Sequence, residues 1–171
     1  MEKKDNNLDK VRQARRAGNG GTQEYFTPRP LVNMMLDKLP ADVFTDFSKT
    51  ILEPSAGNGN FVIAILERRF MNVNHITEIT MALSTVYAVE LMPDNVDEMK
   101  DRIKDLVYKK CGELYSAVDA PDDTASEEID DMWNRTFKPV IDHNIVCHDF
   151  FTWDFERWEP LSVEEKMQAL F

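Results

Sequence analysis

Short runs of apolar and β-branched residues occur at three places along the chain. They cover residues 49–54, 85–90 and 143–147, and each is bounded by polar or turn-forming residues. Runs of this length and composition predict buried strands.

Between these runs, apolar residues recur every three or four positions, which predicts helices. The first is expected after Pro30 and before Pro40, with apolar positions at Leu31, Met34, Met35 and Leu39. A second, apolar on nearly every side, is expected over Phe61–Phe70. A third begins at Pro93, and its apolar stripe is Val96, Met99, Ile103, Leu106 and Val107. Residues 71–84 must form a further helix or a loop.

The order strand–helix–strand–helix–strand is typical of a parallel α/β sheet. Right-handed crossovers would place the three strands side by side in the order 3-2-1. The strand nearest the N-terminus would then lie at one edge.

Two segments differ from this pattern. Residues 1–22 are polar and slightly basic and end in a glycine-rich joint, so they are expected to be a flexible tail, and an arm that touches nucleic-acid phosphates is the alternative. Residues 113–142 interrupt the α/β pattern, and residues 113–131 carry eight acidic side chains and no basic one. We expect a surface insertion there, partly disordered, within a domain that spans 23–171.

Composition narrows the classes of function. The chain has 171 residues and a net charge of −11, so its surface as a whole repels duplex DNA. No apolar run reaches the ~20 residues of a membrane span, and the N-terminus lacks the apolar stretch of a secretory signal. The two cysteines, Cys111 and Cys147, form neither a disulfide framework nor a zinc motif. The expected location is the reducing cytoplasm.

The segment Glu53–Phe61, with sequence EPSAGNGNF, carries the most specific chemical signal. It follows the first strand and precedes a helix, at the edge where open α/β sheets bind ligands. It lacks the Gly-Lys pair of a P-loop, and Val62 stands where a dinucleotide-binding motif needs its third glycine. A bare turn remains the structural alternative.

This segment resembles the [D/E]PxxGxGxF motif of S-adenosylmethionine-dependent DNA adenine-N6 methyltransferases. Upstream, Gln23–Val32 resembles the [Y/F][F/Y]TP motif that precedes the first strand in that family. The resemblance covers about residues 23–155 and implies a Rossmann-like class I methyltransferase fold, of which only the first half, strands 3-2-1, is present.

The resemblance also implies which residues bind S-adenosylmethionine. The TP motif would border its methionine end, Glu53 and the glycine loop would hold its amino and carboxylate groups, and Glu90 would accept the ribose hydroxyls. Leu91, Asp149 and Phe150 would hold the adenine, and Met92, outside the assigned set, could also pack on its ring. Taken one at a time, Glu90 could be a solvent-facing strand end, Asp149 a cap and Phe150 core. The full set is Tyr25, Phe26, Thr27, Pro28, Glu53, Pro54, Ser55, Ala56, Gly57, Asn58, Gly59, Phe61, Glu90, Leu91, Asp149 and Phe150.

The family's catalytic motif, [N/D/S]PP[Y/F], is missing, because the chain contains no Pro-Pro pair. No catalytic residue is therefore assigned, and the chain alone is expected to be inactive. Three explanations stay open: a fragment of a DNA-modifying enzyme of restriction-modification or phage type, one polypeptide of a split enzyme, or an inactive cofactor-binding or protein-interaction module. DNA would be bound through the complete enzyme or a partner subunit.

The first strand would lie in the middle of the family's complete sheet, so here its outer edge lacks a neighbour. Exposed strand edges promote association. We expect a second copy, a partner polypeptide or the chain's own residues 156–171 to cover that edge. In an interaction module, the acidic residues 113–131 and the apolar Met167, Leu170 and Phe171 would be partner surfaces.

Overall fold

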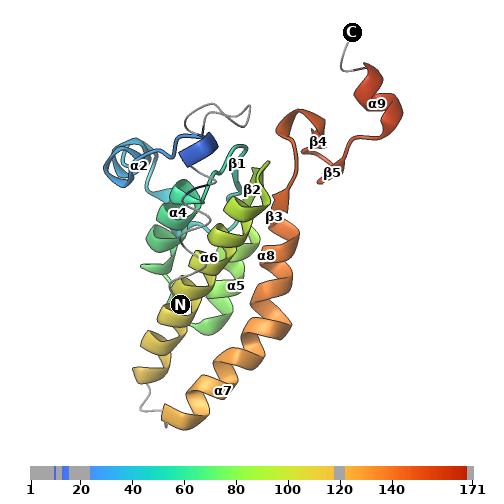
Figure 1. Ribbon diagram of the computed structural model, residues 1–171. Coiled ribbons are helices and arrows are strands. Elements are labelled where there is room, and N and C mark those ends of the chain that lie inside the picture. Colours follow the sequence, from blue (N-terminus) through green and yellow to red (C-terminus); the bar gives the residue numbers. More distant parts are fainter. Residues whose placement is uncertain (1–9, 11–12, 16–23, 118–121, 169–171) are drawn as a thin grey trace.

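A three-stranded parallel sheet and a set of helices form a mixed α/β fold (Figure 1). The structure is a computed structural model that describes residues 10, 13–15, 24–117 and 122–168. The strands are β1 (Ile51–Glu53), β2 (Val86–Glu90) and β3 (Ile145–Cys147), in the order β1-β2-β3. Each falls inside a predicted run, and the predicted order and parallel direction are confirmed.

The helices and the sheet form two layers. One layer contains the sheet together with α5 (Ile76–Ser84), which leads into β2, and α8 (Lys138–Asn144), which leads into β3. In the other layer, α4 (Asn60–Phe70) and α6 (Pro93–Ser116) pack against each other and against β2 (Figure 1). The uncertain segment 71–84 thus contributes a helix, and the helices predicted after the glycine loop and at Pro93 are confirmed.

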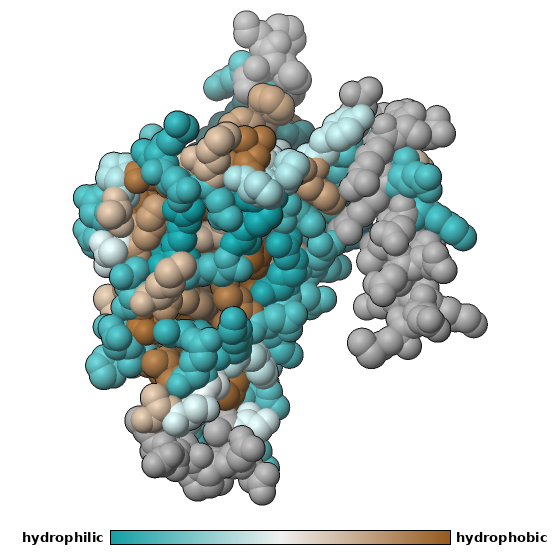
Figure 2. Space-filling view, turned by 90° about the vertical axis from the view of Figure 1, so that its left-hand side faces the viewer, coloured by the Kyte–Doolittle hydropathy of each residue, from teal (hydrophilic) through white to brown (hydrophobic). Residues whose placement is uncertain are grey.

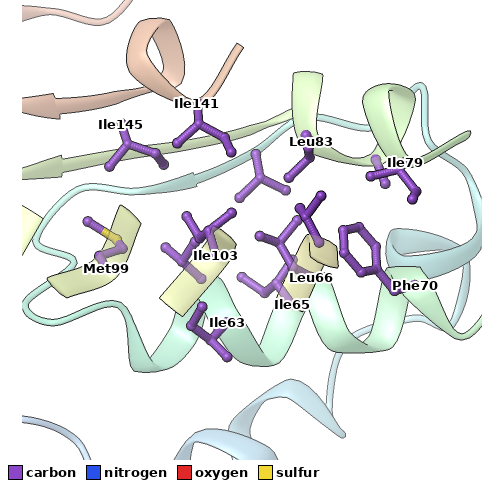
Figure 3. Close-up of a cluster of buried hydrophobic side chains, with 14 of the residues drawn as sticks. Ile63, Ile65, Leu66, Phe70, Ile79, Leu83, Met99, Ile103, Ile141 and Ile145 are labelled. Carbon is purple, nitrogen blue, oxygen red and sulfur yellow. The ribbon is translucent and has the colours of Figure 1, made fainter. Parts of the chain in front are cut away.

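The hydrophobic core lies between these layers (Figure 3). Helix α4 is buried on nearly every side, as predicted, because it packs against α2, α5 and α6. The core side chains labelled in Figure 3 are Ile63, Ile65, Leu66, Phe70, Ile79, Leu83, Met99, Ile103, Ile141 and Ile145.

Helix α2 (Arg29–Leu36) forms where it was predicted, but it buries a different face. Val32 and Leu36 are the buried residues, whereas the four predicted apolar positions are 42–54% exposed. Apolar residues cover a broad arc of this helix, so its packing on α4 decides which of them are buried. Figure 2 faces the side of the molecule where α2 lies and shows apolar patches among hydrophilic ones.

The acidic segment is helical where the structure describes it. Residues 113–116 end α6, and α7 (Asp122–Met132), a π-helix η1 (Trp133–Phe137) and α8 form a continuous helical run that returns to β3. Ile129, Trp133, Phe137 and Ile141 are buried on its inner side. Residues 129–141 are therefore not only a surface insertion, because these four residues belong to the core; residues 118–121, within the stretch expected to be partly disordered, lie outside the described chain.

The C-terminal residues form small elements beyond β3. They are η2 (Phe150–Thr152), a two-stranded antiparallel pair of β4 (Trp153–Asp154) and β5 (Glu159–Pro160), and α9 (Val163–Gln168). Trp158 packs against Tyr87 with ring centroids 4.7 Å apart and donates from Nε1 to the His143 carbonyl at 2.7 Å. The described part of residues 156–171 thus contacts β2 and α8 and does not pair with β1. Leu170 and Phe171 lie outside the described residues.

The two faces of the sheet differ. Val86, Ala88 and Ile145 point into the core. Side chains alternate along a strand, so Leu52 and Tyr87 point to the opposite face. Leu52 is 41% exposed.

Within the described chain, no helix is long and apolar enough to cross a membrane.

Arg69 is fully buried in α4 and links three segments by donating to the Val43, Lys49 and Ala82 carbonyls.

Two predictions, the flexible tail and the start of the TP motif, concern residues that lie largely outside the described chain. Most of the tail at residues 1–22, and Gln23, lie outside it. Residues 13–15 are helical, and Arg15 forms ion pairs with Glu24 and Asp94.

α3 (Asp42–Thr45) is a single turn that leads toward β1.

Candidate cofactor site

A cavity of about 310 Å³ opens at the carboxyl ends of the strands. Parallel α/β sheets bind ligands at this edge, because loops and helix starts meet there. Four segments line it: residues 24–26, the loop after β1, the end of β2 with the start of α6, and the residues after β3.

The structure brings nine of the predicted residues together in the cavity wall. They are Tyr25, Phe26, Pro54, Ser55, Gly57, Glu90, Leu91, Asp149 and Phe150. The other predicted residues lie outside the lining: Thr27, Pro28, Glu53, Ala56, Asn58, Gly59 and Phe61. Met92, which could pack on the adenine ring, also lines it, as do five residues that sequence reasoning did not select: Glu24, Val89, Asn95, His148 and Phe151.

The two glycines of the loop have positive φ angles, +55° at Gly57 and +86° at Gly59. A Cβ atom at Gly57 would lie 3.0 Å from the Phe26 ring, and one at Gly59 would lie 2.5 Å from the Met99 side chain. Both conformation and close packing therefore require glycine here. The contact between Gly57 and Phe26 joins the TP motif to the glycine loop.

Helix α6 holds the loop in place. Arg102 donates to the Asn58 carbonyl at 2.5 Å and to Asn60 Oδ1 at 3.0 Å. Asn58 Nδ2 donates to Glu98 at 2.8 Å, and Asn60 Nδ2 donates to the Thr27 carbonyl at 2.9 Å. Sequence reasoning missed Glu98 and Arg102 because charged residues on an amphipathic helix ordinarily face water.

Glu90 is the most constrained acidic residue of the cavity. It is 7% exposed, and its Oε2 accepts the Gly57 N–H at 2.7 Å. Its Oε1 accepts the Met92 N–H at 2.9 Å and Asn95 Nδ2 at 3.3 Å. Glu90 is therefore not a solvent-facing strand end; it connects the glycine loop to the start of α6.

Asp149 is a cap that also lines the cavity. Its Oδ1 accepts the Phe151 N–H at 2.9 Å and so caps η2. The next two residues expose their rings, Phe150 by 40% and Phe151 by 81%, with centroids 5.3 Å apart. Phe150 is thus a partly exposed ring at the cavity and not a core residue.

Glu53 differs from the other acidic residues because it lies beside the cavity and not in its lining. Its Oε1 accepts the Ser55 N–H at 3.4 Å. Burial raises the pKa of the Glu53 carboxyl above its ordinary value.

The charge of the lining limits the ligands that fit. Glu24, Glu90 and Asp149 contribute three carboxyl groups, and the described residues of the lining include no lysine or arginine. Such a wall favours a ligand with positive charge or hydrogen-bond donors, and the aromatic side chains Tyr25, Phe26 and Phe150 can pack against a planar ring. Among the described residues, no group of three histidine, cysteine or acidic side chains could hold a metal ion.

Comparisons with models of protein families, with curated proteins and with solved structures find no match for this chain. The function must therefore be inferred from the motifs and from the geometry of the cavity.

Proposed function

We propose that the chain binds S-adenosylmethionine in this cavity and is the cofactor-binding part of a DNA adenine-N6 methyltransferase with a Rossmann-like fold. The observation that carries this proposal is the position of Glu90: a buried carboxylate at the end of β2, bonded to the glycine loop after β1. The cavity suits a ligand that combines positive charge, a diol and a planar ring.

The residues of the wall fit the parts of the cofactor. A carboxylate can accept hydrogen bonds from two neighbouring hydroxyls, which assigns the ribose to Glu90. Leu91 and Phe150 supply apolar surface for the adenine, and Asp149 supplies an acceptor for its amino group. Tyr25, Phe26 and Gly57 border the remaining space, where the methionine end would lie.

The bound cofactor would supply an electrophilic methyl group to the amino group of adenine. An exocyclic amine is a weak nucleophile, and the family increases its reactivity with the [N/D/S]PP[Y/F] motif. This chain has no Pro-Pro pair. We therefore assign methyl transfer to the chain only together with a polypeptide segment that brings this motif and contacts DNA.

Calorimetry with millimolar S-adenosylmethionine tests the proposal. The wild-type chain should bind, and Glu90→Gln should weaken binding about 10- to 100-fold, because hydrogen bonds to charged groups contribute about 1.5–3 kcal/mol. Glu127→Gln, on the exposed surface of α7, is the matched control and should bind like wild type. A folded wild-type sample that gives no heat overturns the proposal.

A second assay tests whether this chain can transfer the methyl group without another polypeptide. Labelled methyl groups should not pass from the cofactor to adenine in duplex DNA when this chain is the only protein present. Transfer by the chain alone would show that another group replaces the missing motif.

The alternative is an inactive methyltransferase-like module that binds cofactor or protein partners. The absence of the Pro-Pro motif favours it. Cofactor binding with no methyl transfer after a polypeptide that carries the motif is added would support this alternative, and recovery of methyl transfer on adding such a polypeptide would exclude it.

A further inference from the structure

A network of ion pairs and hydrogen bonds leads from Arg15, in the N-terminal part of the chain, to the cavity. Arg15 Nη1 lies 3.0 Å from Glu24 Oε1, and Arg15 Nη2 lies 2.7 Å from Asp94 Oδ1. The side chains of Arg15, Glu24 and Asp94 are only 14%, 9% and 18% exposed. This is a largely buried cluster and not a surface ion pair.

Asn95 connects this cluster to Glu90. Its Nδ2 donates to Glu24 Oε1 at 2.6 Å and to Glu90 Oε1 at 3.3 Å, and the residue is 1% exposed. Glu24 and Glu90 both line the cavity. The order of contacts is therefore Arg15, Glu24, Asn95 and Glu90, and it ends at the Gly57 and Met92 amides.

The charges make Arg15 essential to this arrangement. The carboxylates of Glu24 and Asp94 are largely shielded from solvent, and Arg15 bonds to both. Among the described residues, neither Glu24 Oε2 nor Asp94 Oδ2 has a hydrogen-bond partner, so no other described contact holds either carboxylate at those atoms. A buried carboxylate that loses its positive partner is strongly destabilised. Without Arg15, Glu24 would move toward solvent. Asn95 would then lose the hydrogen-bond acceptor that orients its side chain.

We propose that Arg15 is a positioning residue of the cavity, which holds Glu24 in the wall and, through Asn95, fixes the Glu90 carboxylate. Residues before the TP motif then belong to the site although they do not line it. The effect on S-adenosylmethionine rests on the proposed function, whereas the effect on Glu90 does not.

Amide hydrogen exchange without any ligand tests the positioning role. The Gly57 and Met92 amides donate to Glu90, so Arg15→Met should make both exchange about tenfold faster or more. Arg15→Lys should restore part of the protection, because lysine keeps the charge but not the two-pronged geometry. Exchange in the core of α4 reports whether each variant is folded.

Arg157→Met is the matched control. Arg157 also bonds to carboxylates, those of Asp154, Glu159 and Glu165, but these lie in the C-terminal segment. This variant should leave the Gly57 and Met92 amides unchanged. Equal exchange of these amides in wild type, Arg15→Met and Arg157→Met would overturn the positioning role.

Calorimetry then extends the test to the ligand. Arg15→Met should weaken S-adenosylmethionine binding about tenfold, and adding Glu24→Gln to it should cost less than Glu24→Gln costs alone, since contacting residues are not additive. Wild type that fails to bind S-adenosylmethionine, with faster amide exchange in Arg15→Met, would overturn the proposed function and leave the network standing. Normal binding by Arg15→Met would overturn its role toward this ligand.

Discussion

Gly57 shows how one residue serves both the fold and the site. Its φ of +55° is a conformation that side-chain-bearing residues adopt at a cost, and its missing Cβ leaves room for the Phe26 ring. The same residue donates its N–H to Glu90. A substitution here therefore changes the loop, the TP motif and the buried carboxylate together.

We predict that Gly57→Ala lowers the free energy of unfolding by about 1–2 kcal/mol from backbone strain, with a further loss from displacement of Phe26. Gly112→Ala is the control, because Gly112 lies in α6 and a Cβ there meets nothing within 4 Å. That change should stabilise the helix by about 0.5–1 kcal/mol. Urea unfolding of both variants gives the comparison, and equal stabilities would contradict it.

Glu53 carries a prediction on pH. Burial raises the pKa of its carboxyl above the ordinary value of 4.5, so the folded state binds the proton more tightly than the unfolded state. The contribution of this carboxyl to stability is therefore greatest at low pH and falls as the pH rises from 4.5 through the raised pKa. Glu53→Gln should be more stable than wild type at pH 7 and should lose this advantage below pH 4.5.

Thermal unfolding across this pH range measures the effect. Glu127→Gln, on the exposed surface of α7, should show no such change with pH. A Glu53→Gln variant with the same advantage at low and neutral pH would refute the role of ionisation.

At the scale of elements, the run from α7 to α8 shows how a π-helix keeps buried residues aligned. Ile129, Trp133, Phe137 and Ile141 are four positions apart, and an α-helix turns such residues by about 40° per step away from a common face. The π-helical residues 133–137 have a wider turn and compensate for this drift. An acidic outer surface and a regular apolar inner side thus occur on one helical run.

Phe137 is fully buried in this run, so we predict that Phe137→Ala lowers the free energy of unfolding by about 3–5 kcal/mol. Thr136→Ala, on the exposed side one residue away, should change it by less than about 0.5 kcal/mol. Circular dichroism during urea unfolding distinguishes the two. A neutral Phe137→Ala would mean that the run is a dispensable surface addition.

At the scale of the whole molecule, the sheet is covered unequally. In the part of the chain that the structure describes, β1 pairs only with β2, and Leu52 on the face opposite the core is 41% exposed. Parallel sheets ordinarily have both faces covered, and exposed strand edges associate. The described C-terminal residues contact β2 and α8 instead of this edge. A second copy or a partner polypeptide remains as the expected cover.

We therefore predict that the isolated chain self-associates at micromolar concentration and that Leu52→Lys reduces this association, because a charged residue on an edge strand opposes pairing. Sedimentation velocity over a range of concentrations measures it. A cooperatively folded wild-type monomer whose β1 amides exchange rapidly would show that the edge is stable in water.

The local pattern of residues was enough to locate the strands, helices α4 and α6, the order of the sheet and the cavity edge. Strand burial and helix amphipathicity are short-range properties, and parallel connections leave few topologies, so these features follow from the sequence alone. The position of Glu90 and Asp149 after their strands likewise placed both residues in the cavity wall.

Only tertiary structure decided which residues surround and support the site. The apolar residues of α2 cover a broad arc, so packing on α4 determined which part of that arc is buried. The acidic charge of 113–131 obscured Ile129, the first of four core residues that continue through Trp133, Phe137 and Ile141. Arg15 meets Asp94 across 79 positions, and Glu24 meets Asn95 across 71. No local pattern encodes such pairs, because polar side chains are ordinarily solvated and only the folded chain brings these together away from water.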